Sequence, residues 1–230
     1  MNDKIIGIIG GMGPEATAAF YIKIIKATKA KKDQDHFRVI IDSNPKIPDR
    51  TKAILGEGEN PVEAIVQAGK NLEKLHADIA CMPCITSHYF IKEIQQQLSI
   101  PVLNALEELN KFVIRQYKSV NTIGVLATSG TIETNLFNQS LPNFNVIYPT
   151  VDSQQTLVME AIYGEKGIKR GNTGNIPLKL LITACEELIE KGAQVIISGC
   201  TEISIVLKPH HIGKPIIDPM DVMAEVVVRH

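Results

Sequence analysis

The fold is indicated by Ile5-Ile6-Gly7-Ile8-Ile9, an apolar run that is followed at once by Gly10-Gly11-Met12-Gly13. A short β-branched run bounded by glycines is typical of a buried strand that ends in a tight turn. Similar runs alternate with longer amphipathic segments along the chain; they are Phe37–Ile41, Asp78–Cys81, Pro101–Leu103, Thr122–Leu126, Val146–Tyr148, Gln194–Ile197 and Pro215–Ile217. Buried strands that alternate with helices predict an α/β fold with mainly parallel sheets and right-handed crossovers.

The pattern of the first half recurs in the second half. The run Thr122–Leu126, like the first run, is followed by a turn of small residues. Cys84 and Cys200 each lie just after an expected strand, and Pro101 and Pro215 each begin another, at nearly the same spacing in both halves. An internal repeat of this kind indicates a duplicated structural unit.

The repeat predicts two similar three-layer α/β lobes that are related by a pseudo-twofold axis. The first lobe is expected to span residues 1–102 and the second residues 103–216. Ligands bind beyond the carboxyl ends of parallel strands. We therefore expect the active site in the cleft between the lobes, with equivalent strand ends facing it.

Composition narrows the class of protein. The 230 residues are sufficient for one substantial core or two smaller ones, and 44% hydrophobic with 21% charged residues is ordinary for a soluble globular protein. The 24 basic and 25 acidic residues give a net charge of −1, so neither nucleic acid nor a membrane is an expected partner. No apolar run approaches the roughly 20 residues that cross a bilayer, and no signal-peptide pattern is present, so we expect a cytoplasmic protein.

The four cysteines are too sparse for a disulfide-stapled domain. Cys81 and Cys84 have the C-x-x-C spacing of redox and zinc motifs, but no second close pair of ligands accompanies them. Cys185 falls within a helical pattern, far in sequence from Cys200. We therefore expect no metal site and reduced thiols.

Cys84 and Cys200 are candidates for acid–base chemistry because of their positions. A thiol at a strand-to-helix junction lies near unpaired backbone N–H groups, which stabilise the thiolate and lower its pKa from about 8.5. One thiolate could remove a proton from one face of a carbon while the other thiol delivers a proton to the opposite face. Their matched positions favour such stereoinversion over the alternative that each is a small core residue.

Five motifs stand out along the chain: Gly10-Gly11-Met12-Gly13-Pro14-Glu15-Ala16-Thr17, Asn44-Pro45-Lys46-Ile47-Pro48-Asp49-Arg50-Thr51, Met82-Pro83-Cys84, Gly199-Cys200-Thr201-Glu202 and Ile217-Asp218-Pro219-Met220-Asp221. In this order they resemble the motifs of the aspartate/glutamate racemase superfamily, and most closely those of its cofactor-independent aspartate racemases. The resemblance implies interconversion of L- and D-aspartate by a two-base thiol/thiolate mechanism without pyridoxal phosphate. It also implies a small acidic amino acid as substrate, a homodimer, and a C-terminal helix at about 217–230 that returns to the first lobe.

The same resemblance assigns roles to charged and sulfur-bearing side chains. It makes Cys84 and Cys200 the paired acid and base, and Arg50 and Lys169 the cations that hold the substrate carboxylates. Arg50 follows a proline-bracketed turn, and a guanidinium matches a carboxylate in bidentate geometry. Lys166 is a neighbouring alternative to Lys169 in the same glycine-rich stretch.

Other expected pocket residues come from the same motifs. Thr86 and Ser87 would line the pocket, and Met12 would lie in the loop beneath it. Ile85 stands where the family usually has Asn, so an amide donor to the substrate carboxylate is missing. That loss could cost about 1–3 kcal/mol of binding, or select a different ligand.

Several polar residues near the motifs have weaker assignments. Thr201 and Thr128 offer hydroxyl or backbone contacts but are equally typical of turns, and Asn44 is a supporting candidate. Glu202 is a candidate for proton relay or for capping within its turn. His88, four residues after Cys84, could form a Cys–His dyad, although a role in filling or orienting the site is favoured.

Three other functions stay open. Glutamate racemase and other acidic-substrate isomerases of the superfamily use the same cysteine positions. A dinucleotide-dependent dehydrogenase is suggested by Gly11-Met12-Gly13-Pro14-Glu15-Ala16 with Asp42 as a ribose contact, but Glu15 would repel a pyrophosphate and Pro14 removes an amide donor. An inactive protein that binds an acidic metabolite is the third, because Ile85 departs from the family pattern.

Overall fold

The computed structural model describes residues 4–229. The chain divides into two compact units, one of Met1–Leu109 with Met220–His230 and one of Asn110–Pro219. The boundaries expected from the sequence, after residues 102 and 216, lie somewhat earlier than those of the structure, after Leu109 and Pro219. The difference arises because α5 (Ala105–Gln116) begins in the first unit, and α12 (Pro219–Val227) belongs almost wholly to it.

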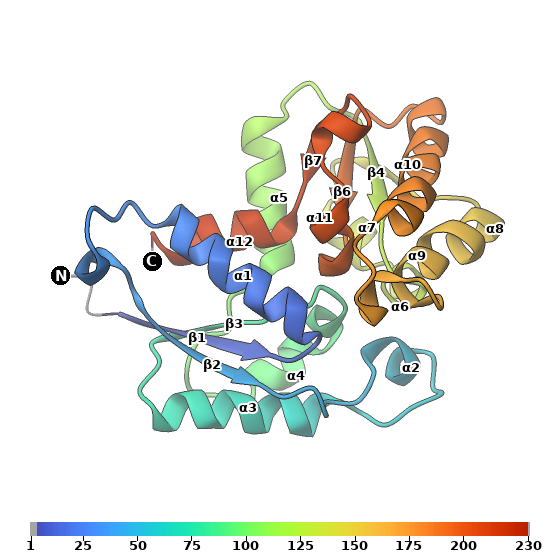
Figure 1. Ribbon diagram of the computed structural model, residues 1–230. Coiled ribbons are helices and arrows are strands. Elements are labelled where there is room, and N and C mark those ends of the chain that lie inside the picture. Colours follow the sequence, from blue (N-terminus) through green and yellow to red (C-terminus); the bar gives the residue numbers. More distant parts are fainter. Residues whose placement is uncertain (1–3, 230) are drawn as a thin grey trace. The chain divides into compact units, whose positions relative to one another are not determined.

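The first unit is built on a parallel three-stranded sheet. β1 (Ile5–Gly10) lies between β2 (Arg38–Ser43) and β3 (Ile79–Cys81), and both pairs are parallel. α3 (Val62–Lys74) packs on one face of this sheet, whereas α1 (Pro14–Ala27) and α12 lie on the other (Figure 1). This layering confirms the α/β fold with parallel strands.

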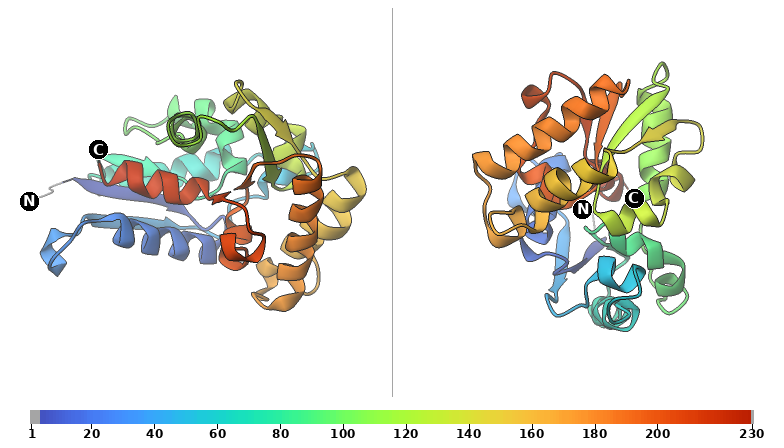
Figure 2. Two further views of the ribbon diagram at one scale, coloured as in Figure 1. Left: turned by 90° about the horizontal axis from the view of Figure 1, so that it is seen from above. Right: turned by 90° about the vertical axis from the view of Figure 1, so that its right-hand side faces the viewer.

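Local sequence explains how α1 begins and how it is held. Pro14 occupies the first helical turn, where its missing N–H would have no helical partner in any case. Thr17 joins the helix to the preceding loop, since its hydroxyl accepts from the Gly11 N–H at 2.9 Å and donates to the Gly13 carbonyl at 2.8 Å. α12 runs beside α1, and Lys23 pairs with Asp221 across them at 2.5 Å (Figure 2).

Short helical segments complete the first unit: η1 (Asp33–Asp35), α2 (Arg50–Ile54), η2 (Thr86–Phe90) and α4 (Ile91–Gln95). The strand expected at Pro101–Leu103 does not form, and only an isolated bridge joins Ala80 to Val102. Pro101 accepts from the Ala80 N–H at 2.8 Å but has no N–H to donate, so this edge pairs over a single residue.

The second unit is built on a parallel four-stranded sheet with the order β5-β4-β6-β7. Its strands are β4 (Thr122–Leu126), β5 (Asn145–Ile147), β6 (Val195–Ser198) and β7 (Ile216–Ile217). α10 (Asn175–Glu190) packs against β4 with Leu181, Cys185 and Leu188 buried. The remaining helical segments are α6 (Ser129–Glu133), α7 (Leu136–Ser140), α8 (Val151–Ser153), the π-helix η3 (Gln154–Met159), α9 (Glu160–Tyr163), η4 (Ile168–Arg170), α11 (Thr201–Val206) and η5 (Pro209–His211).

The two units repeat the same construction. In each, the first strand is central, the second strand lies on one side, and the third strand, which precedes the expected active-site cysteine, lies on the other. The turn into the third strand is the same: the Ala77 N–H donates to the Leu72 carbonyl at 3.0 Å, and the Ala193 N–H donates to the Leu188 carbonyl at 2.9 Å. The sequence repeat therefore corresponds to a structural repeat.

The central glycines of β1 and β4 have a packing reason. A Cβ on Gly7 would lie 2.8 Å from the Leu72 side chain, and a Cβ on Gly124 would lie 2.8 Å from Ile196 and 3.1 Å from Leu188. Each glycine thus lets the helix before the third strand pack closely on the central strand. In the described residues, no helix is long and apolar enough to span a membrane.

Candidate active site

The structure separates the four cysteines into two kinds. Cys84 and Cys200, which follow the ends of β3 and β6, are each 7% exposed, whereas Cys81 and Cys185 are fully buried. Burial raises the pKa of Cys81 far above its usual range, and burial together with the nearby Glu186 raises that of Cys185 to about 12. Cys81 and Cys185 are therefore inert core residues, whereas the two strand-end cysteines, although also buried, retain slight exposure.

In the first unit, the backbone carbonyl of Cys84 accepts two hydrogen bonds from side chains of the following turn. That carbonyl accepts from the Ser87 hydroxyl at 2.6 Å and from the ring Nδ1 of His88 at 2.9 Å. The other ring nitrogen of His88, Nε2, accepts from the Ala105 N–H at 3.1 Å. Both nitrogens of the imidazole are thus occupied by backbone groups, with the proton on Nδ1.

This geometry decides the role of His88. The ring is 2% exposed, and burial lowers its pKa, so the imidazole is neutral. A Cys–His dyad would need a ring nitrogen on the Cys84 sulfur, and both nitrogens have backbone partners instead. His88 therefore orients the Cys84 segment, as the sequence favoured.

Arg50 lies at the start of α2, and α2 contacts η2, the segment that follows Cys84. The side chain of Asp49 caps α2 by accepting from the Lys52 N–H at 3.0 Å. The guanidinium of Arg50 is anchored by the loop before it, since Nη1 donates to the carbonyls of Ile47 at 3.2 Å and Pro48 at 2.8 Å. The first unit thus brings Arg50 and Cys84 onto neighbouring segments.

The other expected residues of this unit are mostly buried. Thr86 is 7% exposed and Met12 4%, and Met12 shares a core cluster with Cys84. Ile85 is 2% exposed and Ser87 fully buried, so the Ser87 hydroxyl serves the turn at Cys84. Asn44 closes the adjacent loop, because its N–H donates to the Gly10 carbonyl at 3.3 Å.

The groups that a dinucleotide would need have other partners. The Gly11 N–H donates to Thr17, and the Asp42 carboxylate accepts from the Asn71 amide at 2.8 Å. The glycine loop is therefore a turn that is bound to α1, and these contacts do not favour the dehydrogenase alternative.

In the second unit, Cys200, Glu202 and Lys169 form one network. The Cys200 sulfur donates to Glu202 Oε2 at 2.9 Å, and the Thr201 hydroxyl donates to the same oxygen at 3.1 Å. Lys169 Nζ contacts the other oxygen, Oε1, at 2.5 Å. Its ammonium also lies 5.5 Å from the centre of the Tyr163 ring.

The charges of this network determine its protonation. Burial by itself raises the pKa of Glu202, but the Lys169 charge and the hydrogen bonds from Cys200 and Lys169 together outweigh burial and lower the pKa, so the carboxylate is ionised. Burial and then the Glu202 charge raise the pKa of Cys200 well above its usual range, although Lys169 opposes them. The expectation that the helix start would lower this thiol pKa is therefore wrong, because burial and a carboxylate at 2.9 Å outweigh the short helix α11.

Besides Thr128, a residue expected from the sequence, several residues that the sequence did not indicate shape the second unit. The Ser198 hydroxyl contacts Ser204 at 2.8 Å and donates to the Cys200 carbonyl at 3.3 Å. Thr128 contacts Thr131 through their hydroxyls, and Gln154 donates to the Ala127 carbonyl at 2.9 Å. The serine and threonine contacts are local but have no distinctive motif, whereas the Gln154 contact joins residues that are far apart in sequence.

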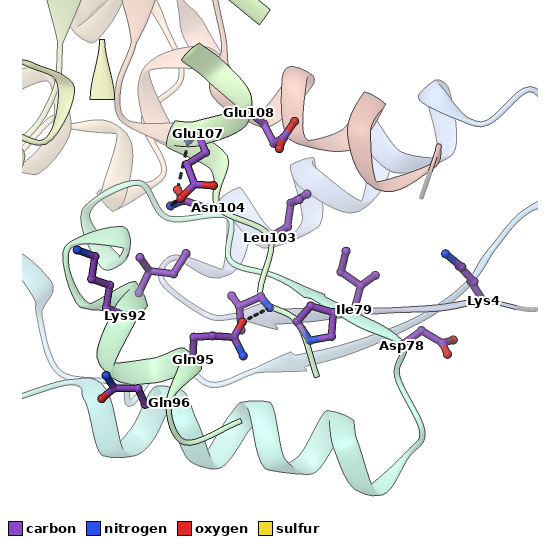
Figure 3. Close-up of a pocket in the computed structure, with 13 residues that line it drawn as sticks. Lys4, Asp78, Ile79, Lys92, Gln95, Gln96, Leu103, Asn104, Glu107 and Glu108 are labelled. Carbon is purple, nitrogen blue, oxygen red and sulfur yellow. Dashed lines mark hydrogen bonds between the residues drawn. The ribbon is translucent and has the colours of Figure 1, made fainter. Parts of the chain in front are cut away.

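A large hollow in the first unit lies away from these residues. It has a volume of about 760 Å³ and is lined by residues at the start of β3, on α4 and at the start of α5 (Figure 3). Two of its polar groups have structural partners: Asp78 accepts from the Ile5 N–H at 2.6 Å, and Gln95 accepts from the Val102 N–H at 2.7 Å. Cys84 follows the opposite end of β3, where parallel strands place their ligands. Among the described residues, no cluster of three or more His, Cys, Asp or Glu could hold a metal ion.

Comparisons with known proteins identify the family of the chain. The family model for Asp/Glu/hydantoin racemases matches residues 9–227. The chain is 32% identical over 228 residues to the broad specificity amino-acid racemase RacX of Bacillus subtilis (strain 168). The match covers 97% of this chain and 96% of that protein.

Solved structures show the same fold. Picrophilus torridus aspartate racemase matches with a TM-score of 0.80 and 27% identity, over 98% of this chain and 93% of that one. Glutamate racemase from Francisella tularensis subsp. tularensis SCHU S4, in complex with D-glutamate, matches with a TM-score of 0.70 over 100% of this chain and 81% of that one; its 19% identity supports the fold alone. The chain therefore belongs to the Asp/Glu/hydantoin racemase family, and its activity class is that of an amino-acid racemase.

Proposed function

We propose that this protein interconverts L- and D-aspartate by a two-base mechanism in which Cys84 and Cys200 act on one α-carbon. The observation that carries the proposal is the equivalence of the two cysteines. Each follows the third strand of its unit, and each retains 7% exposure while the other two cysteines are fully buried.

The chemical step requires a thiolate on one side of the carbon and a thiol on the other. The thiolate takes the α-proton as the Cα–H bond breaks, and the electron pair is delocalised into the α-carboxylate. The opposite thiol then gives its proton to the other face of the carbon, and the two sulfurs exchange roles. No proton or electron is gained or lost, and the mechanism needs no added cofactor.

The substrate's negative charge must be balanced where it binds. In this proposal Arg50 holds one carboxylate, because a guanidinium anchored by two loop carbonyls is already oriented. Lys169 is the second cation, and its contact with Glu202 places it beside Cys200; this favours it over Lys166. Met12, Ile85, Thr86, Ser87 and Thr201 complete the proposed pocket, with Asn44 and Thr128 in support.

The range of substrates is the part of the proposal most open to experiment. The similarity to a broad specificity racemase, together with Ile85 in place of an amide donor, makes neutral amino acids a second candidate class. The purified protein, without added cofactor, should be incubated with L-aspartate, L-glutamate and a panel of neutral L-amino acids. Chiral chromatography then measures the D form.

We expect D-aspartate, and we expect Cys84→Ser to abolish its formation. Cys81→Ala is the matched control, because Cys81 is buried and lies three residues away. Inversion of neutral amino acids without aspartate would overturn the substrate assignment. No inversion of any amino acid would favour an acidic-metabolite-binding protein. The proposal also includes a cytoplasmic homodimer, and light scattering measures its mass.

A further inference from the structure

Glu202 is a buried carboxylate whose two oxygens have different partners. Its side chain is 7% exposed. Oε2 accepts from the Cys200 thiol at 2.9 Å and from the Thr201 hydroxyl at 3.1 Å, while Oε1 contacts Lys169 at 2.5 Å. One carboxylate therefore connects a proposed acid–base thiol to a proposed substrate-binding cation.

Several elements fix this arrangement. Ser198 and Ser204 clamp the turn that carries Cys200, through the Ser198 contacts to the Ser204 hydroxyl and the Cys200 carbonyl. η4 packs against α11 and supplies Lys169, whose ammonium also faces the Tyr163 ring from α9. β6 and α10 also pack against α11, and the charged groups that act on the thiol are Glu202 and Lys169.

We infer that Glu202 is a positioning residue for Cys200: it orients the S–H bond and retains the thiol proton, while Lys169, held on its other oxygen, partly offsets that effect. A carboxylate that accepts from a thiol stabilises the protonated sulfur, because a thiolate would face a like charge. In the resting protein Cys200 is thus the proton donor. This inference rests on the proposed function and deepens it.

The two charges shift the pKa of the Cys200 thiol in opposite directions, so the two single variants should show shifts of opposite sign. Glu202→Gln removes the negative charge beside Cys200, so the thiolate should form at lower pH. Lys169→Met removes the positive charge, so the thiolate should form at higher pH. A merely structural role for the pair would not move the two variants in opposite directions.

The measurement is the pH dependence of Cys200 alkylation by iodoacetamide in the full chain, read from the Cys200-containing peptide by mass spectrometry. Only the thiolate reacts, so the midpoint of the profile reports its formation. We expect Glu202→Gln to lower the midpoint by about one pH unit or more, and Lys169→Met to raise it. The double variant should lie between them. Glu190→Gln, an exposed carboxylate on α10, is the matched control and should leave the midpoint unchanged.

Equal midpoints in the parent and both variants, or shifts of the same sign, would overturn the inference. If Glu202→Gln does not fold, as judged by circular dichroism, the Lys169→Met variant still tests the inference: a raised midpoint supports it, and an unchanged or lowered midpoint overturns it. The alkylation profile does not require turnover. A protein without racemase activity that shows the opposite shifts would therefore disprove the proposed function while supporting the role of Glu202.

Discussion

His88 should make the folded protein sensitive to mild acid. Its ring is buried between the Cys84 carbonyl, 2.9 Å from Nδ1, and the Ala105 N–H, 3.1 Å from Nε2. Protonation would put a proton on Nε2, where the Ala105 N–H already points, and would place a charge in the core. Because burial lowers its pKa below the ordinary 6.5, the unfolded chain binds this proton more readily than the folded protein.

The sign and size of the effect follow from this difference in pKa. Stability is independent of His88 protonation well above pH 6.5, where the ring is neutral in both states. It falls as the pH drops below 6.5 toward the folded pKa, with a limiting slope of about 1.4 kcal/mol per pH unit. At one unit below 6.5, the loss can reach no more than about 1.4 kcal/mol.

The assay compares the parent with His88→Gln by urea unfolding at several pH values between 7.5 and 5.5. The variant should be about 1–3 kcal/mol less stable at pH 7.5, because a buried backbone group loses its partner. Its stability should fall less steeply with acid. Glu187 does not interfere: although partial desolvation acts to raise its pKa, hydrogen bonds from Lys191, Ser153 and the Thr150 backbone lower it to about 2. Parallel pH profiles for the two proteins would refute the assignment of His88 as a buried neutral ring.

Three further substitutions test the repeat and the proposed binding of substrate. Gly124→Ala should destabilise the protein by about 1–3 kcal/mol, because its Cβ would lie 2.8 Å from Ile196, and Gly7→Ala should cost a similar amount; urea midpoints within error of the parent would contradict the close packing. Arg50→Lys should raise the KM for aspartate about tenfold or more with a smaller effect on kcat, because an ammonium cannot satisfy the loop carbonyls and a bidentate carboxylate together. An unchanged KM in steady-state assays would remove Arg50 from the site.

Much of the fold could be predicted because its signals are local. The β-branched runs that became β1, β4 and β6 are short, apolar and bounded by turn residues, and such runs are buried strands in parallel sheets. The run at Pro101–Leu103 also predicted a strand, but it forms only one bridge. It lies at the sheet edge, and Pro101 has no N–H to donate to a neighbouring strand. Its counterpart β7 has only two residues.

The positions of the candidate site residues in the fold were predictable, but their contacts were less so. Cys84 and Cys200 stood out because the repeat places both just after a strand. The link between Lys169 and Glu202 joins residues that are far apart in sequence, and the protonation of Cys200 depends on that link and on burial. Likewise, nothing local in the sequence shows that Ala105 occupies the second nitrogen of His88.

The two-thiol mechanism is tested most directly by the fate of the α-proton. Unlabelled L-aspartate should be incubated with the protein in D₂O, and early products should be examined by NMR and chiral chromatography. We expect the D-aspartate formed to carry deuterium at the α-carbon while the remaining L-aspartate carries almost none, and we expect Cys200→Ser to form no D-aspartate. D-aspartate that retains the original proton, or full inversion by Cys200→Ser, would contradict the mechanism.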